Sequence, residues 1–146
     1  MPTSKNYYLP DVNVWIALSW ERHSFNHAAL QWLTSINAED PVYFCRVSQM
    51  GLLRLLTNSA LMGNFAVTTR QAWNIVDTWV DGIGAEMLPE PEGMEQAFRQ
   101  DSYSHSGKGS HWTDSYLLAT ARQHGLTLVT FDKALAKRSR GKLLHD

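Results

Sequence analysis

The stretch YYLPDVNVWIAL, residues 7–18, places one acidic residue between two apolar segments. Residues 7–12 are predicted to form a short buried strand, and residues 13–20 a helix that follows directly. Asp11 therefore falls where the strand ends, in a segment that otherwise has the composition of a protein interior. A carboxylate in this place either caps the helix or serves a site beyond the end of the strand.

Short apolar strands alternate with amphipathic helices along the rest of the chain. Further helices are predicted at residues 24–36, 48–56, 69–83, 92–103, 112–124 and 134–137, and further strands at residues 42–45, 86–88, 126–130 and 143–144. Ser48 is expected to cap the start of the helix at residues 48–56, and Gly125 is expected to end the helix at residues 112–124. Residues 58–68 and 104–110 are predicted loops. The alternation predicts an α/β domain with a mostly parallel sheet.

Length and composition predict one globular domain over residues 1–146. The single cysteine, Cys45, excludes an internal disulfide and favours a reducing compartment; it is expected in a buried strand. No apolar run approaches the ~18 residues of a membrane span. The N-terminus lacks the pattern of a signal peptide.

The net charge of −1 argues against a broadly basic nucleic-acid-binding protein, but the charges are unevenly distributed. Residues 77–101 contain seven acids and one base, whereas residues 133–142 contain five bases and no acid. The basic segment is either a phosphate-contacting patch or the solvated end of a helix.

Two more acids fall at places comparable to that of Asp11. Asp132 follows the predicted strand 126–130, and Asp114 opens the predicted helix 112–124 on the side that carries apolar residues. Since ligands of such a sheet bind beyond the carboxyl ends of its strands, these acids could meet in one crevice. Each also has a structural interpretation, because Asp11 and Asp132 could cap helices and Asp114 could interact with a helix dipole.

Three converging carboxylates repel one another unless a cation lies between them. Mg²⁺ suits oxygen ligands, takes one or two carboxylates directly, keeps several waters and completes its shell with substrate phosphate. Such an ion neutralises charge on the phosphate and lowers the pKa of a bound water. This chemistry predicts the hydrolysis of a phosphodiester.

The segments LPDVNVWIAL, SQMGLLRLLTN and HWTDSYLLATARQHGLTLVTFD, in this order, resemble a PIN-domain ribonuclease, in particular the VapC-type toxins of bacterial toxin–antitoxin pairs. The resemblance covers nearly the whole chain. It implies an α/β/α sandwich around a parallel sheet and an endoribonuclease site that depends on Mg²⁺ or Mn²⁺. It also implies a cytoplasmic protein, often a homodimer, that is neutralised by a VapB-like antitoxin and cleaves transfer RNA or a ribosomal RNA loop.

Carried over residue by residue, the resemblance implies site residues throughout the chain. Thr130 matches a hydroxyl position beside the site, and Asn13 a polar position near the first acid. Where the family commonly has glutamate, this chain has Gln49, whose amide oxygen can bind a metal or its water but adds no charge. The implied metal ligands are Asp11, Asp114 and Asp132.

Two alternative functions stay open. Gln49 is compatible with a PIN module of weak or absent activity that only binds RNA or a protein partner. The D-V-N-V sequence after the first strand is similar to the opening of haloacid-dehalogenase-type phosphohydrolases, although Asn13 replaces their second acid. A nuclease assay and a phosphate-ester assay would separate the three functions.

Histidines and a loop lysine suggest further sites. His23 and His27 have the spacing of a helical metal site, although a solvated helix N-terminus is the better interpretation. Lys108 lies in a predicted loop and could either reach a phosphate or be an ordinary exposed lysine.

The tryptophans have both structural and functional interpretations. Trp32 and Trp73 fit apolar helix faces and are expected in the core or at a dimer interface. Trp112 is expected in the core, with contact to RNA as the alternative. Trp15 and Trp20 are expected to border a groove for a partner helix, with burial in the core as the alternative.

Overall fold

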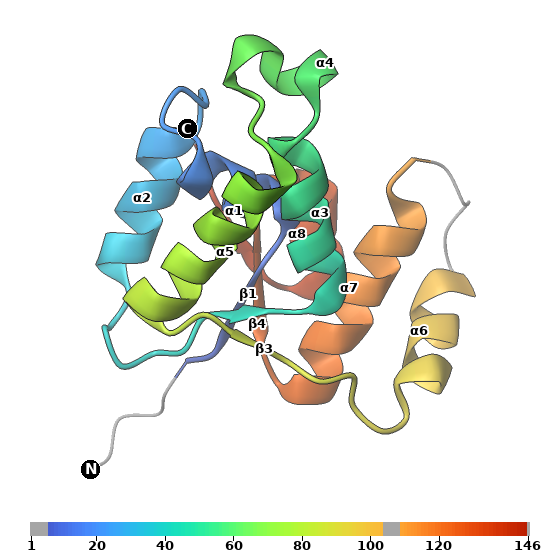
Figure 1. The fold of residues 1–146 in the computed structure, drawn as a ribbon. Coiled ribbons are helices and arrows are strands. Elements are labelled where there is room, and N and C mark those ends of the chain that lie inside the picture. Colours follow the sequence, from blue (N-terminus) through green and yellow to red (C-terminus); the bar gives the residue numbers. More distant parts are fainter. Residues whose placement is uncertain (1–5, 104–108, 146) are drawn as a thin grey trace.

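The computed structural model describes residues 6–103 and 109–145 and contains a fully parallel set of strands (Figure 1). The strands are β1 (Tyr8–Pro10), β2 (Tyr43–Phe44), β3 (Glu86–Met87), β4 (Thr127–Thr130) and β5 (Lys142–Leu143). β1, β4 and β5 form one sheet with β4 in the middle, and β2 pairs with β3. A parallel bridge between Tyr8 and Val42 joins the two parts. The predicted parallel sheet is confirmed.

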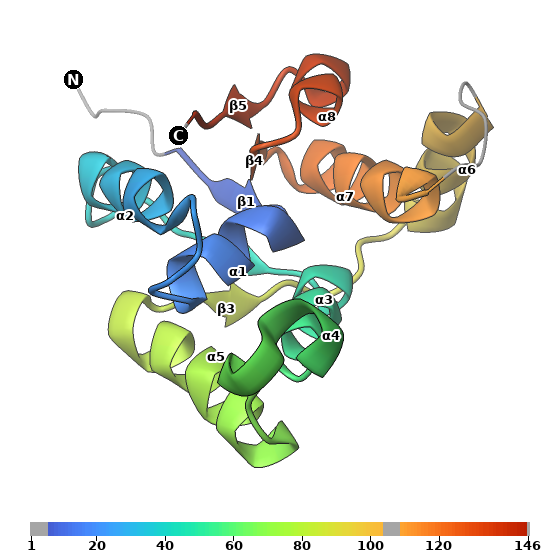
Figure 2. The ribbon, with the colours of Figure 1, turned by 90° about the horizontal axis from the view of Figure 1, so that it is seen from above.

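Helices cover both faces of these strands, as the view onto the strand ends shows (Figure 2). The helices are α1 (Val12–Ser19), α2 (Asn26–Ser35), α3 (Arg46–Leu56), α4 (Ser59–Met62), the 3₁₀ turn η1 (Gly63–Phe65), α5 (Thr69–Ile83), α6 (Met94–Tyr103), α7 (His111–His124) and α8 (Lys133–Ser139). α7 and α8 lie on one side with α6 packed outside α7, and α1, α2 and α5 lie on the other (Figure 2). α3 contacts both α1 and α7.

The alternation of side chains along the strands produces a core on each face. Neighbouring strand residues point to opposite faces, so Leu128 joins the cluster under α7 and α8 while Val129 joins the cluster under α1 and α2. In the same way, Leu9 belongs to the cluster under α7 and α8, and Phe44 belongs to the cluster under α1 and α2. Two cores separated by one layer of strands confirm the predicted α/β/α sandwich.

Local signals decide several element boundaries. Gly125 adopts a left-handed conformation (φ 69°) and ends α7, as predicted. The prediction for Ser48 is wrong: α3 starts earlier, Cys45 is its N-cap, and the Ser48 hydroxyl accepts a hydrogen bond from the Cys45 backbone N–H (3.0 Å). The predicted loop 58–68 is also wrong, because the Asn58 side chain caps the short helix α4. Residues 104–108, including Lys108, lie outside the described part of the chain.

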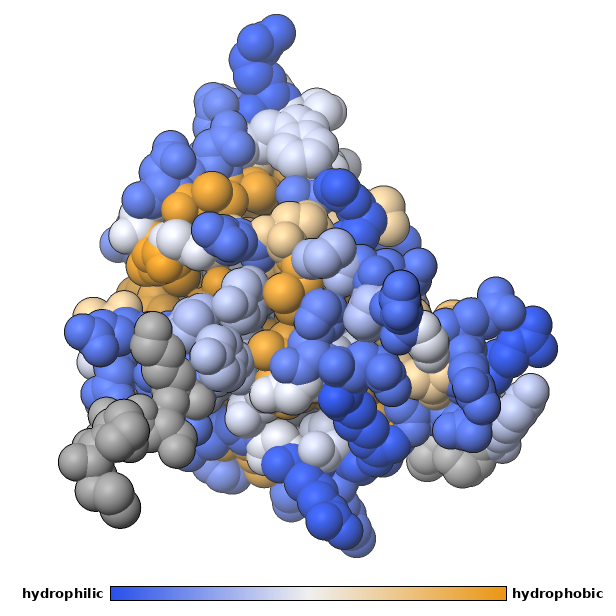
Figure 3. Space-filling view, turned by 90° about the horizontal axis from the view of Figure 1, so that it is seen from below, coloured by the Kyte–Doolittle hydropathy of each residue, from blue (hydrophilic) through white to orange (hydrophobic). Residues whose placement is uncertain are grey.

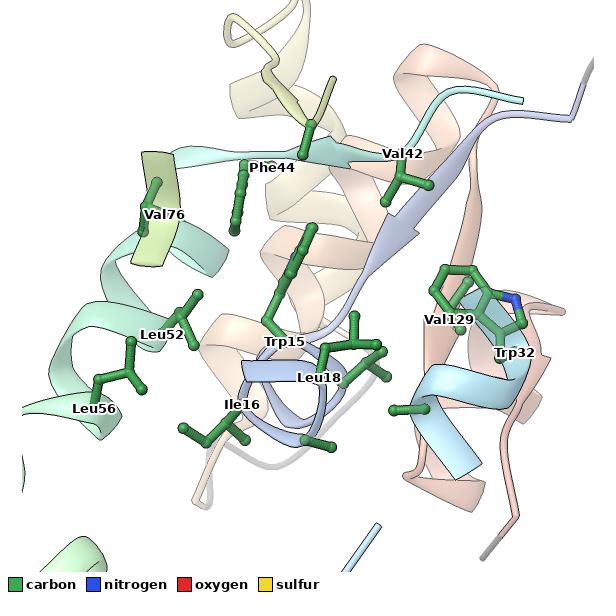
Figure 4. Close-up of a cluster of buried hydrophobic side chains, with 14 of the residues drawn as sticks. Trp15, Ile16, Leu18, Trp32, Val42, Phe44, Leu52, Leu56, Val76 and Val129 are labelled. Atoms are coloured by element: carbon green, nitrogen blue, oxygen red, sulfur yellow. The ribbon is translucent and has the colours of Figure 1, made fainter. Parts of the chain in front are cut away.

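Trp15 occupies the centre of the larger core (Figure 4). Its side chain is fully buried and stacks on Phe44 with ring centroids 4.0 Å apart. The prediction that Trp15 borders a partner groove is therefore wrong, and the alternative of burial in the core holds. Trp20, at the end of α1, is half-buried against Phe65 (6.2 Å between ring centroids). α1 is apolar on nearly all sides because it passes between α2, α3 and β4.

The other tryptophans divide between core and surface. Trp32 is buried, as expected, and so is Cys45. Trp73 is 43% exposed on α5, so it does not lie in the core of the chain, and a dimer contact at this residue stays a prediction. Trp112 is 59% exposed beside Phe98, so the expectation of burial was wrong there. No helix among the described residues has both the length and the apolar character needed to cross a membrane.

Candidate functional site

A cavity of about 1050 Å³ opens at the end of the sheet where β1 and β4 terminate, the end seen in Figure 2. The three predicted acids Asp11, Asp114 and Asp132 all line it, together with Asn13. These side chains come from the ends of two strands and the first turn of α7, as the position of ligand sites in parallel sheets led us to expect. Their role as metal ligands stays a prediction.

Asp11 is a helix cap and a cavity residue at once. One of its carboxylate oxygens accepts a hydrogen bond from the Val12 backbone N–H (2.7 Å), and the other accepts one from the Thr130 hydroxyl (2.8 Å). Only 7% of Asp11 is exposed. Burial raises the pKa of Asp11 to about 6, against the two hydrogen bonds, and the charges of Asp114 and Asp132 contribute to the increase.

Thr130 connects the polar groups on the strand side of the cavity. Its buried hydroxyl donates to Asp11 and accepts hydrogen bonds from the Asn13 side-chain amide (3.2 Å) and the Asp132 backbone N–H (3.0 Å). The Asn13 amide oxygen accepts a bond from the Phe131 backbone N–H (3.3 Å). Thr130 therefore holds the Asp11 carboxylate in place from a chain segment that is distant in sequence, and Asn13 in turn binds the Thr130 hydroxyl.

Asp132 and Asp114 are positioned by their helices. The Asp132 side chain caps α8 by accepting a bond from the Leu135 backbone N–H (3.1 Å). Asp114 is half-buried in the first turn of α7 and accepts a bond from the Ser110 hydroxyl (2.9 Å). Burial raises the pKa of Asp114, and the charge of Asp132 adds to the increase, although the Ser110 bond opposes it. The two interpretations of these acids, helix signals and site residues, are thus compatible.

The helix that forms one wall of the cavity was predicted, but the α3 residues that line the cavity were not. Val47, Met50, Gly51 and Arg54 line the cavity at the spacing i, i+3, i+4, i+7 of one helical stripe. Gly51 allows α3 to approach α1 closely, since a Cβ there would lie 2.5 Å from the Val12 Cγ2 atom. The helical periodicity could have identified this stripe, and with it the exposed cation Arg54.

Gln49 lies off this stripe. It is buried but is not among the residues that line the cavity, and its side-chain oxygen accepts a hydrogen bond from the Arg46 guanidinium. The structure therefore brings the other predicted site residues together without placing Gln49 beside them. The role of Gln49 in the site stays a prediction.

Ser110 lies beside Asp114 in the cavity and was not predicted as a site residue. It precedes the first helical residue, His111, and lines the cavity. A serine directly before a helix is a common N-cap, but the Ser110 hydroxyl makes no capping bond and donates to Asp114 instead. The predicted helix began at Trp112, one residue late, which left Ser110 in a loop.

The polar groups of the cavity fit a hydrated divalent cation. Asp11, Asp114 and Asp132 offer only oxygen donors, the kind that Mg²⁺ and Mn²⁺ prefer. Within residues 6–103 and 109–145, no three His, Cys, Asp or Glu side chains stand close enough to ligate one ion directly. An ion that keeps several waters needs only one or two direct carboxylates, so the donor set agrees with such an ion.

The histidine pair His23 and His27, and Arg138 in the basic segment 133–142, have structural roles. His23 lies outside α2, where its ring nitrogen accepts a bond from the Phe25 backbone N–H (3.0 Å), so His23 and His27 do not share a helix face. The pair therefore lacks the geometry of a helical metal site, and His27 is exposed in the first turn of α2, in agreement with the preferred interpretation as a solvated helix N-terminus. The Arg138 guanidinium donates to the Asp101 carbonyl (2.8 Å) and the Ser115 hydroxyl (3.1 Å), which occupies it in tertiary packing.

Comparison with known proteins agrees with this architecture. A sequence model of the PIN domain matches residues 8–141. The chain belongs to the PIN-domain family, and its sequence relatives place it among the VapC-type members. The haloacid-dehalogenase alternative is therefore wrong, and the resemblance to VapC-type proteins is confirmed.

Individual relatives cover almost the full chain. Ribonuclease VapC41 of Mycobacterium tuberculosis is 36% identical over 133 residues, which are 88% of this chain and 91% of the relative. The crystal structure of M. tuberculosis VapC20, described as a sarcin-ricin loop cleaving toxin, has a TM-score of 0.71 at 12% identity and covers 94% and 99% of the two chains. VapBC2 from Rickettsia felis, bound to a promoter DNA fragment, has a TM-score of 0.66 at 11% identity and covers 94% and 96%.

Proposed function

We propose that this protein is the endoribonuclease toxin of a toxin–antitoxin pair and hydrolyses RNA phosphodiester bonds with a divalent metal ion, Mg²⁺ or Mn²⁺. The observation that carries the proposal is the convergence of Asp11, Asp114 and Asp132 on one cavity at the strand ends of a PIN fold. The similarity to ribonuclease VapC41 supports the same reaction. Gln49 keeps a weakly active or inactive RNA-binding module as the second candidate.

The chain's own residues would hold and orient the reacting groups. Asp11, Asp114 and Asp132 would hold the ion, one or two of them directly and the others through its water shell. When bound, the ion neutralises phosphate charge and lowers the pKa of a water. The Thr130 hydroxyl holds one oxygen of Asp11, and the Val12 backbone N–H holds the other. A carboxylate fixed in this way loses little conformational freedom when the ion and the RNA arrive.

A nuclease assay tests the proposed activity directly. We expect the protein to cleave transfer RNA or ribosomal RNA fragments with Mg²⁺ or Mn²⁺, and to stop when EDTA removes the ion. Asp114→Asn should lower the cleavage rate by roughly 10- to 100-fold or more. Asp81→Asn, which changes an exposed carboxylate on α5, is the matched control and should cleave normally. A folded protein that cleaves none of these RNAs with either ion would favour the inactive module.

RNA binding should use the exposed lysines of α8. Lys133 and Lys137 are one helical turn apart and exposed, and α8 starts at the cavity residue Asp132. Arg138 is excluded from this role by its hydrogen bonds to the fold. We therefore expect Lys133→Gln with Lys137→Gln to weaken binding to uncleavable RNA and to flatten its salt dependence by ~0.7 per lost phosphate contact.

The control for this measurement removes two cations elsewhere. The control variant, Arg70→Gln with Arg99→Gln, alters exposed side chains on α5 and α6. It lowers the net charge by the same two units as the lysine variant. An equal loss of slope in both double variants would mean that total charge, and not the α8 surface, governs binding.

The proposed partner is a VapB-like antitoxin. The structural similarity to VapBC complexes supports this partner class. A homodimer and a cytoplasmic location remain part of the proposal. Trp73, Val80 and Ile83 on α5 are exposed apolar side chains that a second copy could cover.

A further inference from the structure

A second cavity, of about 410 Å³, opens at the opposite end of the sheet, where the strands begin. It includes Tyr8, Thr127 and Lys142, the first residues of β1, β4 and β5, together with Trp32 and Asp40. Figure 3 shows the molecule from this end, where apolar side chains are exposed between larger hydrophilic areas. Asp11 and Tyr8 stand at opposite ends of β1, roughly 10 Å apart at ~3.3 Å per residue, so this strand-start cavity is separate from the acidic one.

Asp40 is the unusual residue of the strand-start cavity. It is only 7% exposed, and its buried Oδ2 atom has no hydrogen-bond partner among residues 6–103 and 109–145. Lys142 lines the same cavity, but no ion pair joins it to Asp40 among the described residues. A buried carboxyl oxygen without a partner is destabilising, so a group that donates hydrogen bonds to it would be bound favourably there.

Aromatic rings form the neighbouring wall. Tyr8 and Trp32 both line the cavity and pack edge to face, with ring centroids 5.6 Å apart and an interplanar angle of 83°. Aromatic faces attract ammonium and guanidinium groups, and a carboxylate pairs with the same groups. The Asn37 side chain adds a polar group at the cavity. An RNA phosphate would instead be repelled by Asp40.

We propose that the strand-start cavity is a second ligand site that binds a guanidinium or primary ammonium group, with Asp40 as the counter-ion and Tyr8 and Trp32 as the aromatic wall. The group could belong to a free diamine or guanidino compound, or to an arginine or lysine side chain. Both sources share the chemistry that the cavity recognises. The volume is in the range of small-molecule sites.

Binding to the full chain tests this proposal. Agmatine and putrescine serve as free probes, and Gly-Arg-Gly with blocked ends serves as the side-chain probe, each titrated calorimetrically and by thermal shift. We expect at least one probe to bind and to raise the melting temperature. Asp40→Asn removes the charge at nearly constant volume and should weaken binding roughly 10- to 100-fold, the effect of losing a hydrogen bond to a charged group.

Two further variants sharpen the result. Glu39→Gln removes a neighbouring exposed carboxylate that does not line the cavity, so it should bind the probe like the parent. Lys142→Gln removes a like charge from the cavity and should bind at least as tightly. Binding of the tripeptide alone would identify a protein side chain as the ligand, and binding of agmatine or putrescine would identify a free cation.

Defined results would overturn the proposal. The proposal fails if no probe binds at ~10 mM, or if folded Asp40→Asn binds the probe as tightly as the parent. It also fails if Glu39→Gln loses as much affinity as Asp40→Asn. Crystals soaked with the probe that showed only water beside Asp40 would overturn it as well. RNA cleavage should be unchanged in Asp40→Asn, so failure of this inference and failure of the proposed nuclease activity are distinguishable.

Discussion

Asp11→Asn is expected to abolish RNA cleavage and to stabilise the metal-free protein at neutral pH. The variant keeps the size of the side chain and an oxygen for the Val12 backbone N–H, but it removes the charge that would hold the ion. Under the proposed function, loss of the Asp11 carboxylate should reduce cleavage at least as much as Asp114→Asn, because Asp11 is the most buried of the three acids.

The gain in stability follows from the raised pKa of Asp11. The ordinary pKa is 3.8 and the folded value is about 6, so below pH 3.8 the carboxyl is protonated in both the folded and the unfolded state. Between pH 3.8 and 6 the folded state binds the proton more strongly than the unfolded state, which favours folding. This contribution to the free energy of unfolding is lost as the pH rises through 6. The difference corresponds to roughly 3 kcal/mol, which the variant should largely recover at pH 7.5.

Urea unfolding at two pH values measures this effect. In the presence of EDTA, Asp11→Asn should exceed the parent in free energy of unfolding by ~1–3 kcal/mol at pH 7.5, and by much less at pH 4. Mg²⁺ should then stabilise the parent more than the variant. A variant that is less stable than the parent at pH 7.5 and still cleaves RNA would show that Asp11 is only a helix cap.

Trp15→Ala is expected to cause the largest loss of stability. Trp15 is fully buried and stacks on Phe44, with ring centroids 4.0 Å apart (Figure 4). The Trp79 ring centroid lies 5.8 Å from that of Trp15. Truncation of a buried tryptophan to alanine typically costs ~3–5 kcal/mol through lost burial and the cavity that remains. Its Nε1 atom has no hydrogen-bond partner in the described part of the chain, so truncation removes no hydrogen bond seen there.

Trp73→Ala is the matched control for this experiment. The same truncation at a side chain that is 43% exposed should change the free energy of unfolding by much less. Urea denaturation of both variants measures the difference in their free energies of unfolding. The comparison requires that the dependence of this free energy on urea concentration is the same in both variants. A smaller loss for Trp15→Ala than for Trp73→Ala would contradict the assignment of Trp15 to the core, unless Trp73 contacts a second copy, which a concentration series would reveal.

Much of the site could be predicted because its residues sit at local signals. Asp11 and Asp132 each follow a strand and precede a helix, and Asp114 lies in the first turn of α7. Strand ends and helix starts are marked by apolar runs and by capping residues, which are properties of neighbouring residues. The same local signals account for the parallel sheet and for Gly125 at the end of α7.

Side-chain direction was predicted less well wherever a helix is apolar on several sides. α1 carries buried residues at five consecutive positions, from Val14 to Leu18, so its periodicity could not assign Trp15 to the core. Helix α7 is similarly apolar, and Trp112 was placed in the core although it is exposed. In such helices the neighbouring elements, and not the repeat of 3.6 residues, decide which face is covered.

The sequence by itself determined most of the order of strands and helices, the two acids that follow strands and the acid that opens α7, because short-range periodicity and capping encode these features. Only the tertiary structure decided what surrounds them. The Thr130–Asp11 hydrogen bond joins residues 119 positions apart, and the bonds of Arg138 to the Asp101 carbonyl and the Ser115 hydroxyl likewise depend on how α8 packs. The unpaired carboxylate of Asp40 becomes visible only when the chain around it is packed, because burial is a property of the whole fold.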